Sequence, residues 1–183
     1  MTEEYIKRVR KGDLDAFRFI ISDWKDAAFT LAISVVKDEH HAADVVQGAF
    51  VKAYLKLDSF KGKASFATWF YRIVVNEAFM DLRKRKKKIL SLEETDWSPV
   101  SKMHDPETEE FREYYINEVL KRMDSGESLA LRLFYLEDLS VKEITEVTGW
   151  SQSKVKVILH RARISFKEML QSVFRIKKED LLA

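Results

Sequence analysis

The chain has 183 residues, of which 46% are hydrophobic and 34% are charged, and this length allows one core or two small ones. It has no cysteine, which excludes a disulfide framework and a thiolate metal site. The N-terminus lacks the apolar core of a signal peptide, and the longest apolar stretch, residues 27–36, is too short to span a bilayer. We therefore expect a cytoplasmic protein without membrane insertion.

The charges are distributed unevenly, although the net charge of +2 is close to zero. Residues 83–88 are six consecutive cations. Residues 89–110 contain seven acidic residues against one basic residue, a net charge of −6. Such asymmetry indicates segments with different partners.

The N-terminal half has helical periodicity almost throughout, and we expect about four helices there. Their approximate ranges are 3–11, 13–35, 39–57 and 65–88. Gly12 should end the first helix, and Asp13 should cap the second.

The third of these helices has a buried apolar face and, opposite to it, a stripe of residues spaced three and four apart. The stripe consists of Asp44, Gln47, Val51 and Lys52. Two interpretations stay open, a solvated helix face, which is the more common case, and a docking surface for another protein. Gly48 costs about 0.5–1 kcal/mol relative to alanine in mid-helix, which hints at a close approach.

The segment 60–88 combines a small basic loop, an aromatic-rich helix and the cationic run. Bases taken out of a duplex need aromatic faces, pockets and phosphate partners, all of which this segment could supply. The alternative is that the aromatic residues pack in the core, as we expect for Phe70. Trp69 and Tyr71 cannot both share the buried stripe of Phe70, so at least one of them should be exposed.

An acidic linker is expected at residues 91–108, where both prolines of the chain, Pro99 and Pro106, lie. It should separate two helical domains, residues 1–90 and 109–183. Since no strand pattern is convincing, we predict an all-α fold. The linker is too polar and charged to form a core of its own, so it should be disordered when the protein is free.

Residues 139–163 predict a helix-turn-helix. Ser140 and Glu143 form a capping box at the start of one helix, Gly149 ends it, and Ser151 caps the next. The second helix should bury an apolar stripe and expose Gln152, Ser153, Lys154, Lys156, His160, Arg161 and Arg163. This donor-rich face favours entry into a DNA major groove over a helical hairpin with a solvated basic face.

Catalytic signatures are absent from the sequence. The four histidines are scattered, and there is no glycine-rich phosphate loop, HExxH motif or nucleophile elbow. We expect no catalytic residue, no metal site, no cofactor and no enzymatic activity.

Five groups of residues, in the right order and spacing, resemble the motifs of the extracytoplasmic-function (ECF) sigma factors of bacterial RNA polymerase. The groups are Gly12-Asp13 with Ala16-Phe17, residues 43–47 with 50–53, residues 66–73 with Asn76 and Asp81, residues 139–140 with 142–144, and residues 155–156 with 160–163. The chain departs from the family at Gly48, where an acid is common, and at Val157, where serine is frequent. Residues 123–127 replace the usual Leu-Pro-Glu turn.

The resemblance implies that the first domain binds the polymerase clamp and the minus-ten promoter element, and that the second binds the minus-thirty-five element. Asp44, Gln47, Val51 and Lys52 would then bind core polymerase. The minus-ten residues would be Lys61, Lys63, Ser65, Phe66, Trp69, Arg72, Asn76, Arg83, Lys84 and Arg85. The minus-thirty-five residues would be the seven donors of the second helix.

The partners expected from the resemblance are bacterial core RNA polymerase, promoter DNA and an anti-sigma factor. The closest alternative is a helix-turn-helix regulator that binds an operator without entering polymerase. A third possibility is an interaction protein with a solvated basic helix. The segment 60–88 separates the first two readings, because an operator-binding protein does not need it.

Overall fold

The structure, a computed structural model, describes residues 2–89 and 109–174. The predicted acidic linker, residues 91–108, therefore lies outside the described residues. All regular elements in the described part are helical, which confirms the predicted all-α class. No helix in this part combines the length and apolar character needed to cross a membrane.

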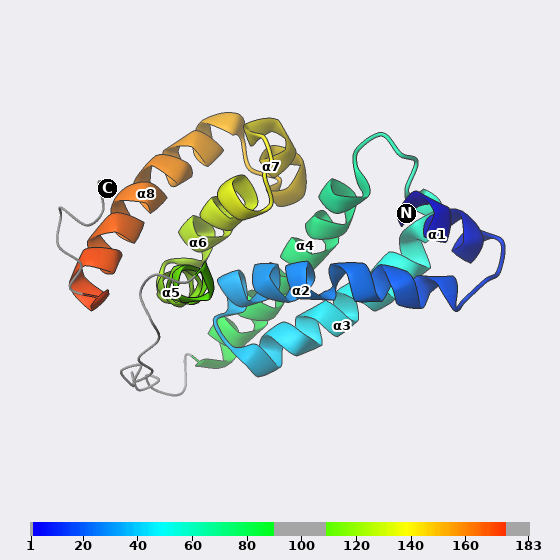
Figure 1. Cartoon of the computed structure of the whole chain (residues 1–183), viewed down its shortest axis with the longest axis horizontal. Helices are drawn as coiled ribbons and strands as arrows, with labels where there is room; N and C mark the ends of the chain where they lie inside the picture. The colour runs from blue at the N-terminus through cyan, green and yellow to red at the C-terminus, as the bar shows by residue number, and fades with distance from the viewer. Residues whose placement is uncertain (1, 90–108, 175–183) are drawn as a thin grey trace.

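The N-terminal helices pack around α2 (Figure 1). They are α1 (Thr2–Arg10), α2 (Ala16–Val36), α3 (Glu39–Lys56), the short 3-10 helix η1 (Leu57–Ser59) and α4 (Phe66–Ile89). Gly12 follows α1 with a φ of +96°, a conformation that glycine adopts without steric cost. Asp38 caps α3 by accepting a hydrogen bond from the His41 amide at 2.8 Å.

The start of α2 differs from the prediction. The helix begins at Ala16, and Asp13 lies in the turn before it. The Asp13 carboxylate still accepts a hydrogen bond from the Ala16 amide at 3.2 Å, and it pairs with Arg8 at 2.7 Å. The Ala16 amide binds one oxygen of this carboxylate and the Arg8 guanidinium binds the other, so Asp13 fixes the corner between α1 and α2. The N-cap position itself is Asp15.

Aromatic side chains form the centre of the N-terminal core. Phe70 is fully buried, as predicted, with its ring 4.8 Å from that of Phe50 and 5.8 Å from that of Phe66. The expectation that Trp69 or Tyr71 would be exposed is wrong. Trp69 is half-buried against Phe66, and Tyr71 is buried with its hydroxyl donating to Glu137 of the C-terminal domain.

The C-terminal helices are α5 (Glu109–Arg122), α6 (Ser125–Leu131), the π-helical turn η2 (Arg132–Leu136), α7 (Val141–Thr148) and α8 (Gln152–Phe174). Asp124 caps α6 by accepting hydrogen bonds from the amides of Gly126 at 2.8 Å and Glu127 at 3.3 Å. A side-chain cap therefore starts this helix at the position where the sigma factors that the sequence resembles commonly have a Leu-Pro-Glu turn.

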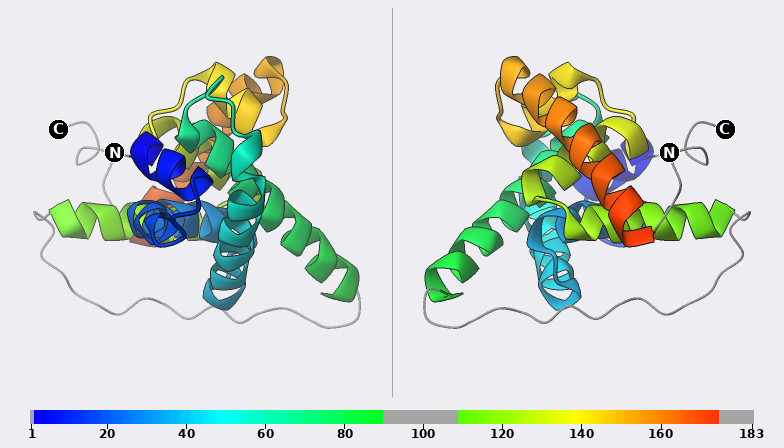
Figure 2. Two further views of the ribbon diagram at one scale, coloured as in Figure 1. Left: turned by 90° about the vertical axis from the view of Figure 1, so that its right-hand side faces the viewer. Right: turned by 90° about the vertical axis from the view of Figure 1, so that its left-hand side faces the viewer.

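The two helical domains pack against one another, with α7 on α4 and α6 on α2 (Figures 1 and 2). Hydrogen bonds cross this interface at several places. Lys37 donates to the Leu120 carbonyl at 2.7 Å, Ser125 donates to the Val35 carbonyl at 2.7 Å, and the Arg132 guanidinium donates to the Ser34 hydroxyl at 3.0 Å. We call this set of contacts, together with the Tyr71–Glu137 hydrogen bond, the interdomain seam.

Lys37 carries a perturbed amino group within the seam. Burial lowers the pKa of Lys37 from 10.5 to about 7. Asp124 acts in the opposite direction, and Arg132 adds to the lowering. The residue also adopts a left-handed conformation, with a φ of 61°, at the C-terminal end of α2.

The low pKa of Lys37 predicts a rise of stability with pH. Between about pH 7 and 10.5 the unfolded chain binds more protons at this residue than the folded chain does. The free energy of unfolding should therefore increase over this window, by at most about 1.4 kcal/mol per pH unit. Chemical denaturation at pH 7, 8 and 9 measures this increase in wild type, in Lys37→Met and in the exposed control Lys25→Met. The increase in the free energy of unfolding should be smaller in Lys37→Met than in the other two proteins. Equal slopes against pH in all three proteins would contradict the prediction.

Candidate nucleic-acid interface

The helix-turn-helix forms as the sequence predicts. The Ser140 hydroxyl accepts a hydrogen bond from the Glu143 amide at 3.3 Å, and the Glu143 carboxylate accepts one from the Ser140 amide at 2.9 Å. The Ser140 hydroxyl also donates to the Glu143 carboxylate, and this hydrogen bond, together with the one from the Ser140 amide, lowers the pKa of Glu143. Gly149 ends α7 with a φ of 72°, and the Ser151 hydroxyl accepts from the Lys154 amide at 3.2 Å. The capping box and the turn thus fix the angle at which α8 leaves α7.

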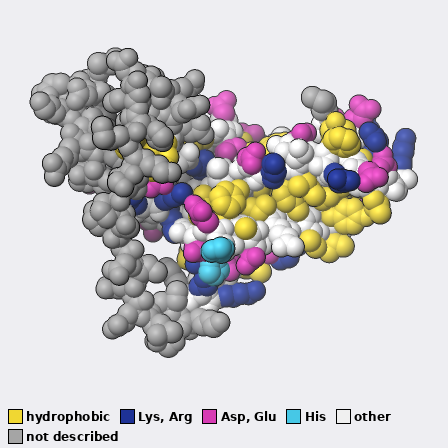
Figure 3. All heavy atoms as spheres, turned by 60° about the horizontal axis from the view of Figure 1, so that its bottom comes forward, with side chains coloured by type: hydrophobic (Ala, Val, Ile, Leu, Met, Phe, Trp, Pro, Cys, Tyr) yellow, Lys and Arg dark blue, Asp and Glu magenta, His cyan; other side chains and the backbone are white. Residues whose placement is uncertain are grey.

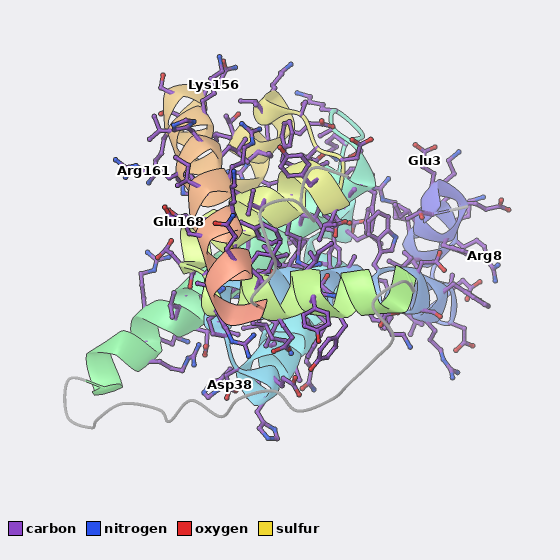
Figure 4. All side chains as sticks on the ribbon, turned by 60° about the vertical axis from the view of Figure 1, so that its left-hand side comes forward. Glu3, Arg8, Asp38, Lys156, Arg161 and Glu168 are labelled. Carbon is purple, nitrogen blue, oxygen red and sulfur yellow. The ribbon has the colours of Figure 1, made fainter. Side chains whose placement is uncertain are left out.

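The outer face of α8 is open to solvent. Val155, Leu159 and Ala162 are buried against the domain, and all seven predicted donors are exposed. Lys156 and Arg161 project outward from the helix (Figure 4). Val157, on the same helix, is half exposed, which the sequence did not predict. A surface of cations, a hydroxyl and exposed apolar groups, including Val157 and Ile164, can contact both phosphates and base edges.

Two of the predicted donors contact aromatic rings of their own domain. The Arg163 guanidinium donates to the Tyr135 hydroxyl at 2.8 Å and lies 5.8 Å from the Phe134 ring. The Lys154 amino group lies 5.3 Å from the Trp150 ring. These contacts orient both cations, so neither is a freely rotating surface charge.

The four residues of the predicted stripe on α3 differ in their exposure to solvent. Asp44, Gln47 and Val51 are exposed, whereas Lys52 is turned toward Glu77 of α4 and forms an ion pair with it. Further large apolar side chains are exposed on α3, on the first turn of α2 and in the turn before it, namely Tyr54, Leu55, Phe19 and Leu14. Figure 3 shows a band of hydrophobic side chains on this face of the molecule. The N-terminal domain therefore presents an apolar surface with polar neighbours, which suits a protein partner.

Gly48, in the same helix, is not required by a close contact. A Cβ atom built at this position would lie 3.8 Å from the nearest atom outside the helix backbone, an oxygen of the Glu77 carboxylate, which is an ordinary van der Waals distance. The close approach that the sequence suggested is therefore not found within the described residues.

The basic loop before α4 is held at its base by Arg10, which donates to the carbonyls of Leu57 and Phe60. Lys61, Lys63 and Ser65 are exposed on it. The predicted contact of Phe66 with DNA does not agree with its burial. Its ring lies 5.3 Å from that of Trp24 inside the core, and only 7% of the residue is accessible. Phe66 thus packs in the core beneath the loop and does not face solvent.

The predicted minus-ten residues on α4 also divide into two groups. Arg72, Asn76, Arg83 and Lys84 are exposed. Arg85 instead pairs with Asp81 at 2.8 Å and donates to the Val36 carbonyl at 2.8 Å, so it joins α4 to the end of α2. The C-terminal end of α4 projects beyond the other helices (Figure 2).

A groove brings residues of the two predicted DNA-binding sets together. It has a volume of about 590 Å³, and Asn76 and Arg83 of α4 lie across from Trp150 and Lys154 of the helix-turn-helix. The rings of Phe79 and Trp150, 6.4 Å apart, also connect the two sides. The described residues contain no cluster of side chains that could hold a metal ion.

Comparisons with known proteins agree with this geometry. The Sigma-70 region 2 family matches residues 20–88, and the Sigma-70, region 4 family matches residues 114–165. The chain is 30% identical to the ECF RNA polymerase sigma factor SigW of Bacillus subtilis over 94% of this chain and 98% of that protein. This chain belongs to the ECF sigma factors. The helix-turn-helix therefore belongs to an RNA polymerase sigma factor, and the operator-binding alternative is not favoured.

Other relatives of this sigma factor support the same assignment. The ECF RNA polymerase sigma-E factor of Escherichia coli K12 is 29% identical over 93% of this chain and 94% of that protein. Two solved structures share the fold. CnrH in complex with the cytosolic domain of CnrY is 24% identical with a TM-score of 0.64, over 92% of this chain and 96% of that one. The sigma factor RpoE of Bartonella quintana in complex with the anti-sigma factor NepR is 21% identical with a TM-score of 0.67, over 86% and 98%.

Proposed function

We propose that this ECF sigma factor acts in the cytoplasm as a non-catalytic subunit of RNA polymerase. Residues 1–90 bind core polymerase and the minus-ten element, and residues 109–183 bind the minus-thirty-five element. The observation that carries the proposal is the pairing of an exposed donor face on α8 with a second basic surface on α4 and its preceding loop. An operator-binding protein needs only the first of these surfaces.

Run-off transcription with purified core polymerase tests the proposal. Adding the protein should produce transcripts from a defined promoter start that core polymerase alone does not give. If the protein binds the template but yields no promoter-specific transcript with competent core polymerase, the proposal fails and a plain operator binder remains.

We also propose that an anti-sigma factor inhibits this protein, because a structural relative, RpoE of Bartonella quintana, was solved with such a partner. Co-purification from cells should recover the inhibitor and core polymerase in separate complexes. We expect separate complexes because the inhibitor and core polymerase would compete for the exposed surfaces of this protein.

The exposed part of the α3 stripe should form the docking surface for core polymerase. Asp44→Ala with Gln47→Ala should weaken core binding by roughly 1–3 kcal/mol, the range typical of interface anchors. Both side chains are exposed, so thermal stability should stay nearly unchanged. Titration of labelled sigma factor with core polymerase measures the affinity. The control is Lys167→Ala with Glu168→Ala, an exposed pair on α8. A folded stripe variant with wild-type affinity would refute the assignment.

Direct readout should depend on Lys156 and Arg161, whose long cationic side chains can donate to guanine O6 and N7. Arg161→Ala should cost about 1–3 kcal/mol and relax the sequence preference at one position. Lys154→Ala, a proposed phosphate contact, should lower the salt slope by about one without changing the preference. Selection of duplexes from a randomised pool compares the variants. Unchanged preferences in both Lys156→Ala and Arg161→Ala would rule out this readout.

Val157 should contact a thymine methyl group. Its side chain is 50% exposed on α8, one turn from Arg161, and has no donor or acceptor of its own. In the major groove the thymine C5 methyl is the apolar feature that such a side chain can recognise. Replacing single thymines of the selected duplex by deoxyuridine should weaken wild-type binding at one position and leave Val157→Ser indifferent there. Equal losses in both proteins at every position would contradict the contact.

A further inference from the structure

Gly48 lies on the face of α3 to which the proposed function assigns the docking of core polymerase. It comes one turn after Asp44 and one turn before Lys52, so the three positions follow one another along the same side of the helix. Asp44 is exposed, and Gly48 is half-buried. Because Gly48 has no side chain, nothing from α3 itself fills the space between the exposed carboxylate and the lysine.

A carboxylate from the neighbouring helix α4 lies beside this position. Helix α4 packs on α3, and the Glu77 side chain of α4 reaches α3 at Gly48. A Cβ atom at residue 48 would lie 3.8 Å from the Oε2 oxygen of Glu77, and within the described residues no other atom outside the helix backbone comes within 4 Å of it. The Glu77 carboxylate therefore occupies the space into which a longer side chain at residue 48 would extend.

The two oxygens of the Glu77 carboxylate have different environments. Oε1 accepts a hydrogen bond from the Lys52 amino group, which ties α3 to α4. Oε2 accepts no hydrogen bond from the described residues, and it is not buried. The whole side chain is 16% accessible. Since each carboxylate oxygen can accept more than one donor, Glu77 can still bind a donor from outside this chain.

We propose that the Glu77 carboxylate of α4 is part of the docking surface for core polymerase, where it binds a lysine or arginine of the polymerase beside Asp44. The inference rests on the proposed function, because it takes the α3 stripe as the docking surface. It adds a residue from a second helix, which the stripe on α3 does not contain. Gly48 is the residue that leaves this carboxylate uncovered.

The charges and the apolar groups around Gly48 favour a cationic partner. The carboxylates of Asp44 and Glu77 lie on either side of it, while the nearby cation, Lys52, is already paired. Charged groups at an interface select partners of the opposite sign and increase the rate of association. Val51, one turn after Gly48, is 54% exposed and would help to exclude water from a docked ion pair.

The alternative is that Glu77 only ties α4 to α3 through Lys52. That role does not need a glycine at residue 48, because the Cβ atom of an alanine would fit there and would favour the helix. A methyl group at this position would, however, occupy part of the space from which a donor approaches Oε2. An uncovered carboxylate therefore explains Gly48 better than the ion pair does. The two roles also differ in how they respond to a change of charge at constant shape.

The experiment titrates the labelled full chain with purified core polymerase at low and at physiological salt. Glu77→Gln keeps the shape of the side chain and its capacity to accept from Lys52, but it removes the charge. The affinity for core polymerase should fall about tenfold, and its dependence on salt should become weaker. The matched control is Glu118→Gln on α5, whose side chain is 15% accessible and also pairs with a lysine, Lys121. This control should bind core polymerase as wild type does.

Moving the charge from α4 to α3 separates docking from the structural tie. Gly48→Glu combined with Glu77→Gln returns a carboxylate to the same place, four residues before Lys52, which is a favourable spacing on a helix. This double variant should recover most of the lost affinity. Gly48→Gln combined with Glu77→Gln has the same shape without the charge, and it should bind as weakly as Glu77→Gln alone. Thermal unfolding verifies that both double variants are folded.

The inference is overturned if folded Glu77→Gln binds core polymerase as tightly as wild type, or if the two double variants bind equally well. Failure of the docking assignment itself gives a different result. In that case Asp44→Ala with Gln47→Ala also binds like wild type, so polymerase docks elsewhere and both proposals fail. If that variant is weakened and Glu77→Gln is not, the α3 stripe binds polymerase without Glu77, and only the present inference fails.

Discussion

The arrangement of this sigma factor depends on how the ends of its helices satisfy their backbone carbonyls. A helix leaves its last carbonyls without internal partners, and buried polar groups of this kind are costly unless something donates to them. At the end of α2 the Val35 carbonyl accepts from Ser125 of the opposite domain. At the end of α5 the Leu120 carbonyl accepts from Lys37 of the opposite domain and from Ser128 of its own. The two domains are therefore joined by hydrogen bonds whose geometry is specific, and the position of every surface on α4 and α8 follows from that join.

Features that arise within a few residues could be predicted from the sequence. The capping box of Ser140 and Glu143 was found because it pairs groups three residues apart. The donor face of α8 was found because its periodicity separates it from the buried stripe. These local rules, with the family motifs, were sufficient for the fold and for membership of the family.

The seam could not be predicted in this way. Tyr71 and Glu137 are 66 residues apart, and Ser34 and Arg132 are 98 apart, so no spacing in the sequence pairs them. The error over Tyr71 has this cause, since the helix face that carries Tyr71 is covered by the other domain. Membership of a motif also does not reveal what a residue does. Phe66 is a core residue, and Arg85 ties α4 to α2, although both lie in the segment predicted to follow DNA.

The groove between α4 and the helix-turn-helix has a consequence for how the protein moves among competing binding sites in a cell. Non-specific attraction to a chromosome grows with the number of cations that can displace counterions from phosphates. With Arg83 and Lys154 facing a shared groove, fewer cations are presented on one continuous surface that a duplex can reach. The net charge of only +2 adds little long-range attraction. With its domains packed in this way, the protein should spend less time on random DNA and remain available to meet polymerase in solution.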